Sequence, residues 1–147
     1  MLKGISPLIS PEMLKVLDEM GHQDKLIIAD ANFPAHRYEK YGVKVIRADG
    51  HNVPEILDAV LQLYPLDTYT KYPVKLMQLA PGDVGKVQTP IWDVFKKIIK
   101  KHDKRGAKAI GTIERMEFYE TCKNVQTIIL TSETAIYATL ILDKGLV

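Results

Sequence analysis

The sequence predicts a single α/β domain in which a central mixed, largely parallel sheet is flanked by helices. Segments with apolar residues at helical spacing mostly alternate with short apolar segments rich in β-branched residues, and this alternation favours parallel strand pairs. The 147 residues fit one domain with an extended core. Since no repeat, linker or low-complexity tract divides the chain, we assign residues 1–147 to one domain.

Each long predicted helix begins with a capping residue followed by a proline. Ser10 precedes Pro11, Asn52 precedes a proline two positions later, and Thr89 precedes Pro90. Apolar residues then recur at helical spacing on one face. These patterns predict helices over residues 10–20, 52–64 and 89–105, and a shorter helix over residues 114–123.

The predicted strands are short runs that end at proline, glycine or polar residues. They cover residues 26–29, 43–46, 73–80, 107–113, 125–130 and 135–142, and the segment 32–42 is expected to be irregular. A short polar turn joins the last two strands. We therefore expect those two strands to form an antiparallel hairpin.

Composition excludes several classes of protein. The formal net charge of +2 is too small to argue for nucleic acid or an anionic membrane surface, and no apolar run has the length of a spanning helix. The N-terminus lacks the apolar stretch of a signal peptide. The single cysteine, Cys122, excludes an internal disulfide and fits a reducing compartment, so we expect a cytoplasmic protein.

The segment 20–34 contains the strongest candidate site. Asp30 follows a buried strand, and ligands of open α/β sheets bind at that end of the strands. His22 lies shortly before the same strand, and histidine is well suited to proton transfer near neutral pH. We expect His22 and Asp30 to lie in one small region. The structural alternatives are that the histidine only fixes a turn through a carboxylate, and that the aspartate forms an Asx-turn.

Four side chains in this region also allow a metal-binding hypothesis. They are His22, Asp24, Asp30 and His36, whose donor atoms suit zinc or manganese. No H-E-x-x-H motif or cysteine pair is present, so this remains the minor hypothesis.

Three further side chains are candidates for binding a polar ligand. Arg115, Tyr119 and Tyr137 carry hydrogen-bond donors. The structural alternatives are a surface ion pair for the arginine and half-buried packing for the tyrosines.

Several long motifs resemble those of the L-fucose mutarotase family, which is related to the ribose pyranases. The resemblance is carried by residues 1–12, 19–36, 45–50, 115, 118–120, 137 and 141–145. It covers nearly the whole chain and is weakest over residues 66–108.

The resemblance implies a cofactor-free enzyme that interconverts the α and β anomers of free L-fucose. It implies that His22 is the catalytic proton donor and that Asp30 and Arg115 bind the sugar. A Tyr-Gly-Asn triplet of the family corresponds here to Tyr137-Ala138-Thr139, so backbone contacts would persist and a side-chain amide contact would be lost. With Tyr119, these three residues complete the predicted substrate-binding set.

The resemblance also implies a homo-oligomer made of subunit rings, commonly paired into decamers, with sites near subunit contacts. The partner of the imidazole in proton transfer is left open among water, Asp30 and Tyr137. Two other functions remain possible on these residues: a mutarotase of the D-ribose pyranase type and a monosaccharide-binding protein without catalysis.

Overall fold

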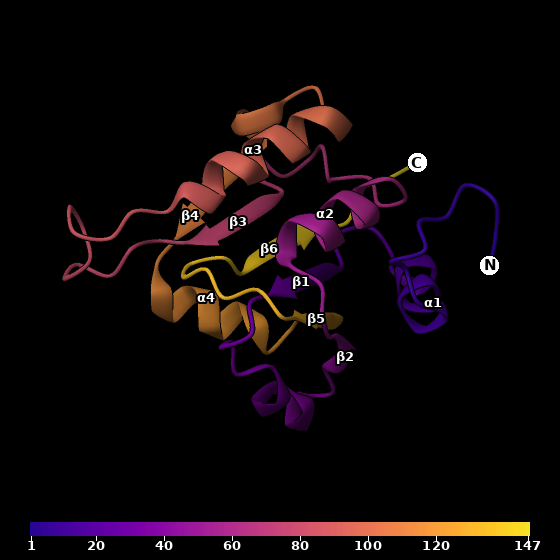
Figure 1. The fold of residues 1–147 in the computed structure, drawn as a ribbon, viewed down its shortest axis with the longest axis horizontal. Coiled ribbons are helices and arrows are strands. Elements are labelled where there is room, and N and C mark those ends of the chain that lie inside the picture. Colours follow the sequence, from indigo (N-terminus) through magenta and orange to yellow (C-terminus); the bar gives the residue numbers. More distant parts are fainter.

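The computed structural model describes residues 1–147 as one layered α/β unit (Figure 1). The elements follow in the order α1 (Pro11–Glu19), β1 (Lys25–Ala29), the 3₁₀ helix η1 (Ala35–Tyr41), β2 (Lys44–Ala48), α2 (Val53–Leu61), β3 (Val74–Met77), α3 (Pro90–His102), the 3₁₀ helix η2 (Gly106–Ala109), β4 (Ile110–Ile113), α4 (Arg115–Cys122), β5 (Thr127–Thr131) and β6 (Leu140–Asp143).

The six strands form one mixed sheet in the order β2-β5-β1-β6-β3-β4. The pairs β1–β5, β2–β5 and β3–β4 are parallel, whereas β6 runs antiparallel to both of its neighbours, β1 and β3. This confirms the predicted single domain with a mixed, largely parallel sheet.

The predicted hairpin of the last two strands is wrong. β5 lies between β1 and β2 and is hydrogen-bonded to both, so neither of its edges is free for β6. β6 instead fills the space between β1 and β3. The connecting residues 132–139 therefore cross the end of β1, a distance that a tight hairpin turn does not span.

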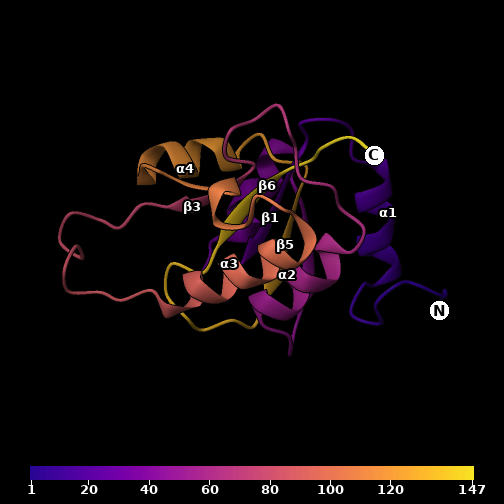
Figure 2. The ribbon, with the colours of Figure 1, turned by 90° about the horizontal axis from the view of Figure 1, so that it is seen from above.

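Helices cover both faces of the sheet. Figure 2 shows α2 and α3 on one side of the strands and α4 on the other. Alternate residues of β1 follow this division, because Leu26 and Ile28 pack in the larger apolar cluster with α1, α2 and α3. Ile27 and Ala29 pack in the smaller cluster with α4 and η1.

The helix starts agree with the predicted capping signals. The Ser10 hydroxyl accepts a hydrogen bond from the Met13 amide, and Asn52 and Glu55 form a reciprocal capping box. Thr89 precedes α3 without a side-chain capping bond, so Pro90 alone marks that start.

Three predicted boundaries differ in the structure. Residues 35–41 form a 3₁₀ helix within the segment expected to be irregular, and η2 replaces the start of the strand predicted from residue 107. β6 begins at Leu140 and not at residue 135, because Tyr137 adopts a left-handed conformation with φ 56° that interrupts an extended strand.

A helix able to cross a bilayer would need a long apolar stretch, and none of the helices in this structure meets that requirement.

Candidate active site

A cavity of about 280 Å³ opens at the carboxyl end of β1, where Asp30 follows the strand. Arg115 enters it from the first turn of α4, and Thr139 enters it from just before β6. Because β6 is antiparallel to β1, the start of β6 and the end of β1 meet at the same edge of the sheet. The lining residues are Asp30, Asn32, Phe33, Pro34, Met77, Arg115, Tyr119, Ile136, Tyr137 and Thr139.

The Asp30 carboxylate is held at the floor of this cavity by two donors. The Thr139 hydroxyl donates to Oδ2 at 2.6 Å, and the Asn32 backbone amide donates to Oδ1 at 3.0 Å. The second bond is the Asx-turn expected from the sequence, and it coexists with a carboxylate that lines the cavity.

Tyr137 is fixed at the cavity rim through both its backbone and its hydroxyl. The hydroxyl donates to Asp83 Oδ2 at 2.5 Å and accepts from the Ala80 amide at 3.0 Å, while its carbonyl accepts from the Trp92 indole at 2.9 Å. These bonds hold a non-glycine residue in the left-handed region, a strain typical of functional sites.

The bonds to Tyr137 also determine its protonation. Donation from the Ala80 amide lowers the pKa of Tyr137, but its bond to the Asp83 carboxylate, burial and the negative charge of Asp83 outweigh this and raise the pKa above its ordinary value. The phenol therefore stays protonated near neutral pH, which argues against Tyr137 as the proton-accepting base.

Aromatic rings also line the cavity. Phe33 stacks on Tyr119 with ring centroids 6.3 Å apart, and the Arg115 guanidinium carbon lies 5.7 Å from the centre of the Tyr119 ring. The cavity is thus lined by an anchored carboxylate, a cation and apolar rings, and the cation lies beside one of those rings. This combination suits a ligand with hydroxyl groups and a hydrocarbon face.

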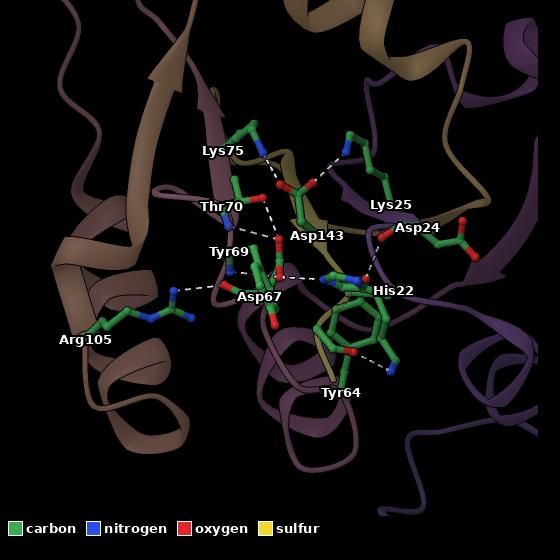
Figure 3. A network of polar contacts seen from close by, with 12 residues as sticks. His22, Asp24, Lys25, Tyr64, Asp67, Tyr69, Thr70, Lys75, Arg105 and Asp143 are labelled. Atoms are coloured by element: carbon green, nitrogen blue, oxygen red, sulfur yellow. Dashed lines mark hydrogen bonds and ion pairs between the residues drawn. The ribbon is translucent and has the colours of Figure 1, made fainter. Parts of the chain in front are cut away.

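His22 lies near the other end of β1, in a separate polar network (Figure 3). Its Nε2 is 3.0 Å from Oδ1 of Asp67, and its ring lies 5.3 Å from that of Tyr69. The Asp67 carboxylate, which is fully buried, also accepts hydrogen bonds from the Tyr69 amide and from the amide and hydroxyl of Thr70.

The network keeps Asp67 ionised. Burial alone would raise the pKa of Asp67, but the bonds from Thr70, Tyr69 and His22 outweigh it and hold the pKa well below its ordinary range. An ionised carboxylate can only accept hydrogen bonds, so Nε2 of His22 must carry the proton that it shares with Asp67. Nδ1 is then the ring nitrogen left to exchange protons, on a side chain that is 34% exposed.

The expectation that His22 and Asp30 share one small region is wrong for a single chain. His22 precedes β1 and Asp30 follows it, and the five residues of that strand span about 17 Å. His22 does not line the cavity that contains Asp30. Within one chain, therefore, the imidazole and the carboxylate cannot contact the same small molecule.

Of the other predicted site residues, all but Ala138 line the cavity. Asp30, Arg115, Tyr119, Tyr137 and Thr139, which belong to the predicted substrate-binding set, line one cavity. Ala138 is fully buried and packs in the larger apolar cluster, so its methyl group faces away from the cavity.

The residues of the metal-binding hypothesis do not converge. His36 pairs with Glu39 on the surface, and Asp24 accepts from the Gly21 amide. No group of three or more histidine, cysteine, aspartate or glutamate side chains in the chain has the geometry of a metal site.

Sequence reasoning missed two acidic residues that support the site. Asp67 orients His22, and Asp83 holds the hydroxyl of Tyr137. For Asp67 a signal was present in the sequence Asp67-Thr68-Tyr69-Thr70. The aspartate lies two and three positions before the backbone amides that donate hydrogen bonds to it, as in an Asx-turn. Nothing local in the sequence links Asp83 to Tyr137, because 54 residues separate them.

The fold and the cavity define a class: a small α/β protein with a ligand-sized cavity, lined by polar and aromatic side chains, at the carboxyl end of a parallel strand. A sequence profile of the RbsD / FucU transport protein family matches residues 3–147, and the chain belongs to that family.

Individual relatives are similar over nearly their full length. The fucose mutarotase of Homo sapiens is 45% identical over 145 residues, covering 98% of this chain and 93% of the human protein. The crystal structure of FucU from Bifidobacterium longum superposes with a TM-score of 0.94 at 55% identity, covering 99% of both chains. The fucose mutarotase of Streptococcus pneumoniae, solved in complex with L-fucose, gives a TM-score of 0.89 at 41% identity, also over 99% of both chains.

Proposed function

We propose that this protein is an L-fucose mutarotase, an isomerase that interconverts the α and β anomers of the free sugar. The observation that carries the proposal is the cavity with an anchored carboxylate, a guanidinium and an aromatic wall. It occurs in a chain that is 41% identical, over 99% of its length, to a fucose mutarotase crystallised with L-fucose.

The cavity offers complementary groups for a deoxyhexose. The Asp30 carboxylate accepts hydrogen bonds from sugar hydroxyls, and Arg115 donates to sugar oxygens. Phe33, Tyr119 and Met77 offer apolar surface to the hydrocarbon face and methyl group of fucose. Holding the pyranose in one orientation aligns its anomeric centre for proton transfer.

Mutarotation needs only two proton transfers. A base removes the proton of the anomeric hydroxyl while an acid protonates the ring oxygen, so the bond from C1 to the ring oxygen breaks and C1 becomes an aldehyde. The aldehyde rotates, and the reverse transfers close the ring on its other face. A positioned imidazole contributes on the order of 10²- to 10⁴-fold to such a step.

We assign the proton on the ring oxygen to His22, delivered from Nδ1. Its Nε2 is engaged with Asp67, which fixes the ring orientation and faces the positive charge that the imidazole acquires on protonation. Since Tyr137 is held protonated, water or Asp30 is the remaining candidate for the base at the anomeric hydroxyl.

Because the two ends of β1 are far apart, His22 must reach the sugar from a second copy of the chain. A head-to-tail contact, in which the His22 end of one copy meets the Asp30 cavity of the next, is heterologous, and such contacts form a closed ring when the rotation between neighbours closes. We propose such a ring as the active form, with two rings forming the decamer that the family resemblance implies. The single, buried Cys122 thiol is compatible with the cytoplasm, where we place this activity.

A complementation experiment tests both the chemistry and the shared site. His22→Ala and Asp30→Asn should each abolish enhanced anomer exchange of L-fucose, measured by saturation-transfer NMR. Co-expressed in equal amounts, they should recover roughly a quarter of the native rate, because one neighbour pair in four combines an intact cavity with an intact histidine. His36→Ala and Asp18→Asn make the same chemical changes on the surface and serve as controls.

The outcomes separate the alternatives. Full activity of folded His22→Ala would remove the assigned proton donor, and no recovery on co-expression would remove the shared site. L-fucose binding without enhanced exchange would indicate a sugar-binding protein, and faster exchange of D-ribose than of L-fucose would indicate a ribose pyranase. Light scattering measures whether the protein has the mass of a decamer.

A further inference from the structure

We propose that Thr139 is a positioning residue that fixes the Asp30 carboxylate for the sugar and does not itself donate a hydrogen bond to the sugar. This inference rests on the proposed function of the cavity. It assigns to Thr139 a role that differs from substrate binding, although its side chain lines the same cavity as Asp30.

Thr139 and Asp30 form a reciprocal pair of hydrogen bonds. The Thr139 hydroxyl donates to Oδ2 of Asp30 at 2.6 Å and accepts from the Asp30 backbone amide at 3.0 Å. A hydroxyl has one proton, and the carboxylate receives it. Thr139 therefore has no donor left for a ligand, and the residue is only 4% exposed.

The pair determines how Asp30 is presented. One oxygen is held by Thr139 and the other by the Asn32 amide, so both side-chain torsions of Asp30 are fixed before a ligand arrives. A carboxylate has about four acceptor positions, and about two remain after these bonds. Two hydroxyls of a sugar can donate to these positions, and binding then costs no conformational entropy of the Asp30 side chain, because the site is preorganised.

The strand register around Thr139 explains how its side chain reaches Asp30. Thr139 immediately precedes β6, whose antiparallel register places Leu140 opposite Ile28 of β1. Continuing this register by one residue toward the end of β1 places Thr139 opposite Ala29, the last residue of that strand, and therefore next to Asp30. Its branched side chain has few rotamers, which keeps the hydroxyl directed at Asp30.

Thr139→Val tests the proposal because it preserves the shape of the side chain and removes the hydroxyl. We expect the Kd for L-fucose, measured by calorimetry, and the KM for anomer exchange to rise about tenfold, the effect of one charge-assisted hydrogen bond. kcat should change less than KM. Thr139→Ser retains the hydroxyl and should return both constants to within about twofold of the native values.

The chain supplies a matched control in Thr127. It is fully buried in β5, and its hydroxyl has no hydrogen-bond partner, so Thr127→Val makes the same chemical change without removing a bond. We expect native Kd and KM for this variant. A rise equal to that of Thr139→Val would overturn the proposal, because it would trace the effect to the loss of any buried hydroxyl.

A double-variant cycle separates positioning from general support of the fold. If Thr139 acts through Asp30, adding Thr139→Val to Asp30→Asn should weaken L-fucose binding by no more than about twofold beyond Asp30→Asn alone. A further tenfold loss would overturn the proposal. So would a native Kd for Thr139→Val. If the native protein neither binds L-fucose nor exchanges its anomers, the proposed function fails first, and that result is distinct from either of these.

Discussion

Replacing Asp67 with asparagine should destabilise the protein strongly and in a pH-dependent manner. Asp67 is fully buried, and its two oxygens accept four hydrogen bonds, from the Tyr69 amide, the Thr70 amide and hydroxyl, and His22. Asparagine keeps one acceptor oxygen and turns the other into a donor. In either orientation of the new amide, one partly buried backbone amide, that of Tyr69 or that of Thr70, then faces a donor and loses its partner.

The size of the effect follows from these contacts. A hydrogen bond to a charged group contributes about 1.5–3 kcal/mol, and a buried donor left unpaired costs about 1–3 kcal/mol. We expect Asp67→Asn to lower the free energy of unfolding by about 3 kcal/mol, or the Tm by about 10 °C for a chain of this length. Asp18→Asn, on the exposed face of α1, is the control and should change neither.

The pH dependence distinguishes a charge effect from loss of packing. The pKa of Asp67 is lowered in the folded protein, so its stabilisation is fully present above the unfolded pKa of about 4 and is lost as the pH falls below it. Below that pH the unfolded chain takes up a proton that the folded chain does not. The advantage of the native protein over Asp67→Asn should therefore shrink by about 1.4 kcal/mol per pH unit.

Thermal unfolding of both proteins at fixed protein concentration, at pH 7, 4 and 3, measures this directly. A difference in Tm that stays constant from pH 7 to pH 3 would refute the argument. A loss of Tm for Asp67→Asn that is no larger than the loss for Asp18→Asn would also refute it. Since Asp67 also orients His22, the variant should lose anomer-exchange activity at temperatures where it remains folded.

Two further variants test other contacts. Tyr137→Phe removes the hydroxyl that donates to Asp83. We expect faster amide hydrogen exchange in residues 80–87 and a loss of about 1 kcal/mol in the free energy of unfolding. Native exchange rates in these residues would show that the hydroxyl does not anchor them. Gly145→Ala would place a Cβ 2.5 Å from the backbone oxygen of Leu66, so denaturant titration should show a loss of about 1–3 kcal/mol, whereas Gly82→Ala, with nothing within 4 Å of its Cβ, should show none.

The helices and most strands were accessible from the sequence because their signals are local. Ser10 and Asn52 cap helices through bonds to residues three positions away. The apolar run 26–29 predicted β1, in which residues 26–29 are fully buried between the two helical layers. Strand pairing is not local. The position of β6 between β1 and β3 depends on which sheet edges remain free after the other strands have paired.

The cavity was predictable in part. Asp30 was identified from its place after a strand, and Arg115, Tyr119 and Tyr137 from the hydrogen-bond donors that they carry, whereas the roles of Asp30 and Arg115 in sugar binding came only from the family resemblance. The interruption of β6 by Tyr137 escaped prediction, because a tyrosine in the left-handed region is held there by distant partners such as Asp83 and Trp92.

The sequence by itself determined the α/β class, the helix starts and the chemical groups available for sugar binding, because caps, periodicity and residue types act over a few positions. The tertiary structure decided which of those groups meet. It joined Asp30 to Thr139 across 109 residues and joined His22 to Asp67 across 45. It also separated His22 from Asp30 by the length of β1, since a strand is extended and its two ends lie far apart.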